Sequence, residues 1–163
     1  MEGNKVKARA ILAFGAPCSG KTTFCEKFAK QFKAPFYELD ELKAKNKLTR
    51  KHVLLLVEQL AKTGQTLVFE GGVGTEEERK EIVSILRRAN YEPYLVWFQT
   101  DVATLRTRLK TREGSVAKAK AEYELAVKKL EAPTEIEKPI VLSGKHTYPT
   151  QLRHVLSRLA QQC

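Results

Sequence analysis

The segment Gly15–Thr22 constrains the fold more than any other part of this sequence. It reads Gly-Ala-Pro-Cys-Ser-Gly-Lys-Thr and matches the pattern G-x-x-x-x-G-K-[ST]. An apolar run with the length of a buried strand, residues 10–14, comes directly before it, and residues 23–32 place phenylalanines along one helical stripe. Strand, glycine-rich loop and helix, in this order, form the context in which such a loop binds phosphate.

Each part of this loop has a physical task. Gly15 and Gly20 allow a tight turn that directs backbone N–H groups at phosphate oxygens. Lys21 supplies positive charge toward the β- and γ-phosphates, and the Thr22 hydroxyl is a ligand for Mg²⁺. The following helix adds its free N–H groups and the positive end of its dipole. The residues expected to bind the nucleotide here are Gly15, Ala16, Pro17, Cys18, Ser19, Gly20, Lys21, Thr22 and Thr23.

The length of 163 residues predicts a single domain, residues 1–163, that is large enough to bury a core. No apolar run approaches the ~20 residues of a membrane span, and the first residues do not resemble a secretory leader. The cysteines Cys18, Cys25 and Cys163 suit a reducing compartment better than a disulfide scaffold. We therefore expect a cytoplasmic protein without membrane contact, and a monomer.

The charge balance indicates an affinity for anions. The chain has 29 basic and 19 acidic residues, a net charge of +10, which favours nucleotides, nucleic acids or phosphorylated metabolites as partners. The excess is concentrated in residues 43–51, where basic side chains follow one another with no acid between them. Such a run is either a solvated face or, given its position after the second expected strand, one wall of an acceptor site.

Strands and helices alternate along the chain. Strands are expected at 9–14, 35–39, 66–69, 94–98 and 139–142, and helices at 21–32, 41–47, 50–63, 75–89, 101–111, 116–130 and around 152–159. Fully apolar strands that alternate with helices predict an α/β fold with a parallel sheet covered on both faces. Ligands of such sheets bind beyond the carboxyl ends of the strands, so the loops that begin at Gly15, Asp40, Glu70, Thr100 and Ser143 are expected to form the site.

Two carboxylates stand at these strand ends. Asp40 follows the second strand, where it could accept the proton of an attacking hydroxyl during phosphoryl transfer. The alternative is that Asp40 only caps the helix at 41–47. Glu70 ends the third strand, where it would act on Mg²⁺, most plausibly through water, or contact the substrate. The alternative is a surface glutamate.

Arginines gather at the end of the helix expected at 101–111. Arg108 and Arg112 are one turn apart and share a face, just before the break at Gly114. A closing arginine can meet the charge that spreads over the transferred phosphoryl group. Because a second helix follows the break, these arginines are expected to sit on a lid, although a solvated helix face has the same composition.

Together, the loop at residues 15–22, Asp40, Glu70, Arg79 and the arginines of residues 106–112 resemble small P-loop kinases. The resemblance is nearest to the zeta-toxin and polynucleotide-kinase type, which is related to gluconate, shikimate and nucleoside monophosphate kinases. It implies a three-layer P-loop kinase fold: a five-stranded parallel sheet of order 2-3-1-4-5, helices on both faces and a small helical lid at about 108–131.

The resemblance also implies roles for single residues. Asp40 would be the base on the acceptor hydroxyl, with Glu70 and Arg79 near the substrate. The loop after the fifth strand, with Gly144 and Lys145, would border the adenine of ATP. Two departures concern this site: Glu70 replaces the usual Asp, and residues 71–74 replace a stretch that often contains Asn.

The sequence thus predicts an ATP-dependent kinase that uses Mg²⁺ and phosphorylates a hydroxyl of an anionic acceptor: a nucleic-acid end, a nucleotide or a small metabolite. Lys21, Asp40, Arg108 and Arg112 would be catalytic, and Thr22 and Glu70 would hold the metal. The rival interpretation is a switch or binding module that hydrolyses a nucleoside triphosphate without an acceptor. The absence of an N-K-x-D motif, and of a glutamine placed to orient water after the third strand, disfavours it.

Overall fold

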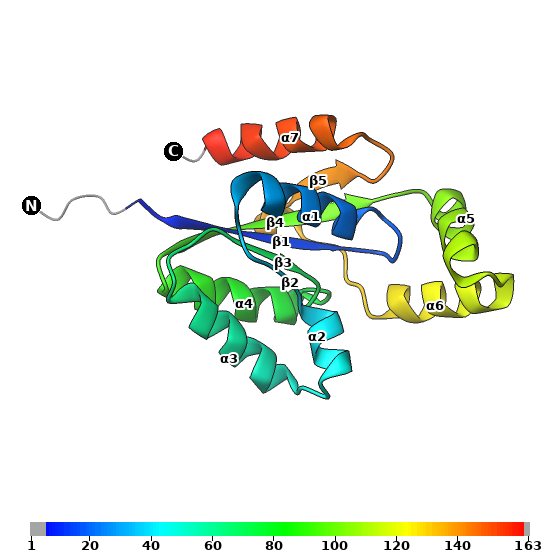
Figure 1. Cartoon of the computed structure of the whole chain (residues 1–163), viewed down its shortest axis with the longest axis horizontal. Helices are drawn as coiled ribbons and strands as arrows, with labels where there is room; N and C mark the ends of the chain where they lie inside the picture. The colour runs from blue at the N-terminus through cyan, green and yellow to red at the C-terminus, as the bar shows by residue number, and fades with distance from the viewer. Residues whose placement is uncertain (1–5, 162–163) are drawn as a thin grey trace, which may run out of the picture.

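The computed structural model describes residues 6–161, so Cys163 lies outside the described residues. Within them, five parallel strands form one sheet (Figure 1). Their order, β2-β3-β1-β4-β5, confirms the predicted 2-3-1-4-5 topology. The strands are β1 (Ala8–Gly15), β2 (Phe36–Glu38), β3 (Leu67–Glu70), β4 (Tyr91–Gln99) and β5 (Ile140–Ser143).

Helices cover both faces of the sheet, and the fold is that of a P-loop kinase. Side chains of α3 and α4 pack with one face, and those of α1 and α7 pack with the other, so the layers in Figure 1 read helix, sheet, helix. The helices are α1 (Lys21–Phe32), α2 (Leu39–Lys45), α3 (Arg50–Ala61), α4 (Glu76–Arg88), α5 (Val102–Glu113), α6 (Val116–Lys128) and α7 (Tyr148–Ala160), with a 3₁₀-helix η1 at Glu135–Glu137. No helix in the part of the chain that is described is long and apolar enough to cross a membrane.

The central strand β1 sets the position of the site. Its residues 10–13 are completely buried because β3 and β4 flank it and helices cover both of its faces. It ends at Gly15, directly before the loop that starts α1. Helices α5 and α6 lie beyond this carboxyl end of the sheet (Figure 1), where the predicted lid was expected.

Among the element boundaries that differ from the sequence expectations are those of β2, α2 and β4. The second strand stops at Glu38 and α2 begins at Leu39, so Asp40 lies inside the first turn of α2 and Glu38 takes the N-cap position. Strand β4 begins at Tyr91, earlier than expected, and contains Pro93. Pairing with β5 begins only at Val96, so Pro93 lies where β4 has a single partner strand and a missing N–H is tolerated.

Candidate nucleotide and acceptor site

The phosphate-binding loop has the backbone that its glycines predict. Gly15 has φ +150°, and a Cβ there would lie 2.5 Å from the carbonyl oxygen of Phe98. Gly20, with φ +95°, precedes α1. Lys21 opens that helix, and its Nζ donates to the carbonyls of Gly15 at 3.0 Å and Ala16 at 2.7 Å. Burial lowers the pKa of Lys21, and the negative charge of Glu70 opposes this shift.

Glu70 completes this centre from the end of β3. Its Oε1 accepts a hydrogen bond from Thr22 Oγ1 at 2.9 Å. Its Oε2 is buried and, among the described residues, has no hydrogen-bond partner. Burial raises the pKa of Glu70. A buried carboxylate oxygen without a partner, beside a hydroxyl, is a donor set that suits a hard cation such as Mg²⁺, so these residues fit the metal.

Glu38 is a site residue that the sequence reasoning missed. It pairs with Glu70 in the register of β2 and β3, and parallel partners in register point to the same face of a sheet. A hydrogen bond with Glu41, burial and the charge of Glu70 raise the pKa of Glu38 to about 7. The expected strand 35–39 placed Glu38 inside the strand, so the sequence did not single it out; in the structure Glu38 ends β2 as Glu70 ends β3.

Asp40 lies beside the loop that follows β3. Its Oδ1 accepts a hydrogen bond from the backbone N–H of Gly72 at 3.1 Å. Gly71 has φ +77°, and a Cβ there would clash with Asp40 Oδ2. The glycines of this loop therefore permit a close approach of the backbone to the carboxylate of Asp40.

Two cavities meet at the loop. One, of about 870 Å³, lies on the donor side and is lined by residues of the phosphate loop, α1, α5 and the segment after β5. The other, of about 920 Å³, lies between α2, the β3–α4 loop and α6. Four residues line both: Pro17, Lys21, Glu38 and Glu70. The charged centre described above therefore forms the boundary between two cavities.

The lid arginines face the donor side. Arg108 donates from Nη1 to the carbonyl of Cys18 at 3.0 Å and from Nη2 to the carbonyl of Gly144 at 3.1 Å. It therefore ties the phosphate loop to the loop after β5. Arg112 also lines the donor cavity and pairs with Glu122 of α6. Arg108 and Arg112, the two arginines of the predicted lid, thus line the donor-side cavity and not the other one.

The loop after β5 divides into two parts. Gly144 lines the donor cavity and packs so tightly that a Cβ would clash with the carbonyl oxygen of Ser19. Lys145, which was expected to bind the nucleotide, lines neither cavity, because its ammonium pairs with Asp101 at the start of α5. His146 and Tyr148 extend the donor wall in its place.

The basic run at residues 43–51 does not act as one patch. Lys43 and Lys47 line the acceptor-side cavity. Lys45 pairs with Glu41 on the exposed side of α2. Arg50 is turned toward α4, where it pairs with Glu81. Only part of the run therefore faces an acceptor.

Arg79 was expected near the substrate, but the structure places it away from both cavities. Its side chain is completely buried and lines neither cavity. Its guanidinium is bonded to Glu137 at 2.6 Å and to backbone carbonyls around it. The structure therefore does not place Arg79 against an acceptor, because the donors of its guanidinium are used inside the protein.

The sheet order and the loop at the end of the central strand define a P-loop kinase fold. A family model described as an AAA domain, AAA_33, matches residues 11–133. The chain belongs to this family. No curated protein matches it.

Solved structures support the fold. A gluconokinase from Sinorhizobium meliloti 1021 is similar with a TM-score of 0.70 at 18% identity, covering 98% of this chain and 95% of that one. The APS kinase of Mycobacterium tuberculosis, in complex with AMPPNP and APS, has a TM-score of 0.66 at 16% identity, covering 94% and 98%. A shikimate kinase from Aquifex aeolicus has a TM-score of 0.53 at 17% identity, covering 94% and 97%.

Proposed function

We propose that this protein is an ATP-dependent kinase that transfers the γ-phosphoryl group to a hydroxyl of an anionic acceptor. The observation that carries the proposal is the pair of cavities that meet at Lys21, Glu38 and Glu70. A transferase needs separate spaces for donor and acceptor on the two sides of one charged centre. The AMPPNP in the similar APS kinase supports ATP as the donor.

The roles of the residues follow from their places. Asp40 lines the acceptor cavity and would take the proton of the attacking hydroxyl. Lys21, Arg108 and Arg112 line the donor cavity and would balance the negative charge of the transferred group. Thr22, Glu70 and Glu38 would hold Mg²⁺, which neutralises charge on the phosphate oxygens when it is bound.

Unpaired lysines favour an anionic acceptor. Lys43, Lys47 and Lys129 line the acceptor cavity from α2 and from the end of α6. Among the described residues, none of the three has an ion pair or hydrogen-bond partner. Three carboxylates of this cavity, Glu38, Asp40 and Glu70, lie at or just after the ends of β2 and β3. The other three already have partners: Glu41 pairs with Lys45, Glu78 accepts from the N–H groups of Gly74 and Thr75, and Glu122 pairs with Arg112. An acceptor would thus place its hydroxyl toward Asp40 and its anionic group toward the lysines.

The rival function, hydrolysis without an acceptor, leaves the second cavity unexplained. Incubation with γ-labelled ATP and a panel of gluconate, shikimate, nucleotides and 5′-hydroxyl oligonucleotides separates the two. Label on one of these compounds supports the kinase. Label released only as inorganic phosphate supports the rival.

A lysine series tests the anionic acceptor. Lys43→Gln with Lys47→Gln should raise the KM for the labelled acceptor and flatten its dependence on salt. Lys45→Gln is the matched control, because Lys45 lies on the same helix as Lys43 but lines neither cavity. Equal effects of the control and the double variant would contradict the assignment of the lysines.

A further inference from the structure

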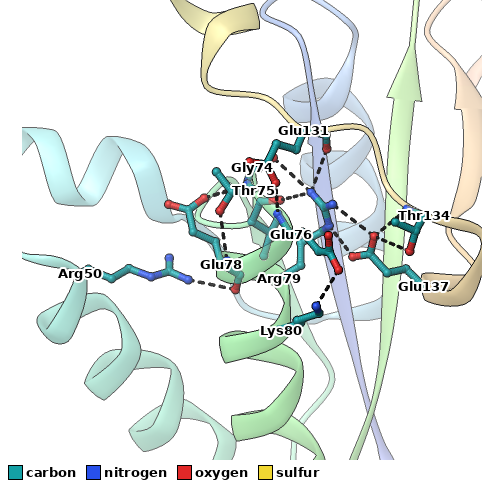
Figure 2. Close-up of polar contacts among 11 residues, drawn as sticks. Arg50, Gly74, Thr75, Glu76, Glu78, Arg79, Lys80, Glu131, Thr134 and Glu137 are labelled. Carbon is teal, nitrogen blue, oxygen red and sulfur yellow. Dashed lines mark hydrogen bonds and ion pairs between the residues drawn. The ribbon is translucent and has the colours of Figure 1, made fainter.

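Arg79 is the one charged residue among residues 6–161 whose side chain is fully buried. It lies in the first turn of α4, and Figure 2 shows its guanidinium among bonded groups from several segments. Nε and Nη2 donate to the two carboxylate oxygens of Glu137 at 2.6 and 3.2 Å. Nη1 lies within 3.3 Å of the carbonyls of Val73, Gly74 and Glu131. A buried charge is costly unless it is paired and hydrogen-bonded, and this one is both.

These bonds join segments that are far apart in the sequence. Val73 and Gly74 belong to the β3–α4 loop, Glu131 lies just after α6, and Glu137 belongs to η1. The backbone adds two further links at the same place. The N–H of Glu131 donates to the carbonyl of Gly74 at 2.8 Å, and the carboxylate of Glu131 accepts from the N–H of Glu76 at 2.8 Å. The chain that leaves α6 is therefore fastened to the loop that leads into α4.

The other side of the β3–α4 loop holds Asp40. The N–H of Gly72 donates to Asp40, and the carbonyl of Gly72 accepts from Arg50 Nη1 at 2.7 Å. The guanidinium of Arg79 also lies over the ring of Phe14, 5.0 Å from its centre, and Phe14 lines the acceptor cavity. Arg79 thus contacts two parts of the wall of the acceptor cavity, the β3–α4 loop and the ring of Phe14, without lining the cavity itself.

Helix α6 has contrasting ends. Its C-terminal end carries Lys129 and Leu130 into the acceptor cavity and is followed at once by the bonded Glu131. Before its N-terminal end lies Gly114, which has φ +67° and no atom within 4 Å of the place where a Cβ would be. The C-terminal end is thus fixed, and the other end adjoins an open turn.

We propose that Arg79 is a positioning residue that clamps the end of α6 to the β3–α4 loop and so sets the width of the acceptor cavity. It does not touch substrate; it acts through the segments that do. The acceptor role of the cavity rests on the proposed kinase function, whereas the clamp itself does not. The charge state of Glu137 agrees with it: burial would raise the pKa of this carboxyl, but the bonds from Arg79 and Thr134 outweigh burial and hold the pKa below its usual range.

Hydrogen exchange in the protein without nucleotide tests the clamp directly. Arg79→Lys keeps the charge but cannot serve all the acceptors. It should raise the exchange rate of the amides at residues 72–75 and 130–137 by tenfold or more. The amides of β1 are the internal reference, because a general loss of stability would raise them as well. Lys80→Met is the control variant, since Lys80 lies on the same helix in an exposed pair with Glu76.

The KM values for acceptor and for ATP distinguish a residue that positions the acceptor wall from one that only stabilises the fold. With an acceptor found by label transfer, Arg79→Lys should raise the acceptor KM about tenfold and leave the KM for ATP within twofold, because the clamp touches the acceptor wall and not the phosphate loop. Glu137→Gln should reproduce the same split if Arg79→Lys folds poorly. Equal rises in both KM values would overturn the positioning role.

Different results would overturn the clamp by Arg79 and the proposed kinase function. Unchanged exchange at residues 72–75 and 130–137 in both variants would overturn the clamp, whether or not the protein is a kinase. A wild-type protein that labels no acceptor would overturn the proposed function, and the exchange measurement would still decide the clamp. Raised exchange at these segments alone, with β1 unchanged, supports it.

Discussion

Thr22 Oγ1 lies 2.9 Å from Glu70 Oε1, so the first turn of α1 is joined to the end of β3 at the boundary of the two cavities. This bond leaves the second oxygen of Glu70 buried, with no hydrogen-bond partner in the described part of the chain. A bound cation would give this buried oxygen the partner that it lacks, and so would stabilise the charged form of Glu70.

Glu70→Gln should therefore lower the affinity for Mg²⁺ more than it lowers the stability of the fold. Gln keeps the size and the bond to Thr22 but loses the charge. The Mg²⁺ concentration that half-saturates ATP binding should rise about 10- to 100-fold, the range for groups that support a metal site. Titration of ATP binding with Mg²⁺ measures this. Glu26→Gln is a control carboxylate on α1 that lines neither cavity.

Lys21→Ala should remove most of the rise in melting temperature that ATP with Mg²⁺ produces in the wild type. A ligand that binds only the folded state stabilises it, and Lys21 is the cation at the centre of the loop. Thermal melts with and without nucleotide measure the shift. A full shift in the variant would mean that the nucleotide binds elsewhere.

Asp40→Asn should lower turnover by about 10²–10⁴-fold and leave ATP affinity nearly unchanged. Asn retains an oxygen for the N–H of Gly72, so the variant removes the charge and keeps the contact. Glu58→Gln on α3 is the control, because Glu58 is exposed and lines neither cavity. Full activity of Asp40→Asn toward an identified acceptor would exclude Asp40 as the base and make Glu70 the next candidate.

Alkylation of Cys18 should block nucleotide binding, and bound ATP should protect it. Cys18 is half-buried in the donor cavity, whereas Cys25 is buried in the core and burial raises the pKa of its thiol, which makes it unreactive. Mass spectrometry of the labelled peptides measures protection. Cys18→Ala should bind ATP after the same treatment; equal labelling with and without ATP would place Cys18 outside the bound phosphates.

The Arg79–Glu137 pair should give stability that depends on pH. Because the pKa of Glu137 lies below its ordinary 4.5 in the folded protein, its contribution is present above about pH 4.5 and is lost as the pH falls below that value. Glu137→Gln should lower the free energy of unfolding by about 3–5 kcal/mol at pH 7, the range for a buried pair that loses one partner. Urea unfolding across pH 3–7 should show the two proteins converge at the acid end.

Patterns local in the sequence predicted most of the fold. The strand–loop–helix order around residues 15–22, the helix expected from residue 75 and the bounds of α1 all follow from short-range chemistry, and the structure confirms them. Contacts between distant segments were not readable. Nothing near Arg79 in the sequence indicates that its partner is Glu137. The two residues meet only because the chain after α6 packs against the start of α4.

The placement of Asp40 shows the same limit on a smaller scale. Asp40 was expected directly after the second strand, but it lies inside α2 because Leu39, the last residue of the expected strand, begins that helix. Glu38 was overlooked for a related reason: its significance depends on the register that pairs it with Glu70, and register is a property of the assembled sheet.

The order in which the donor cavity is assembled follows from its walls. Lys21 is synthesised before Gly144 and Tyr148, which line the same cavity and lie beyond β5. A nascent chain that has not yet reached β5 carries the phosphate loop without an enclosed nucleotide site. Nucleotide bound as proposed would therefore stabilise the fold only after the chain has been synthesised beyond Tyr148, and folding before that point would rely on the chain alone.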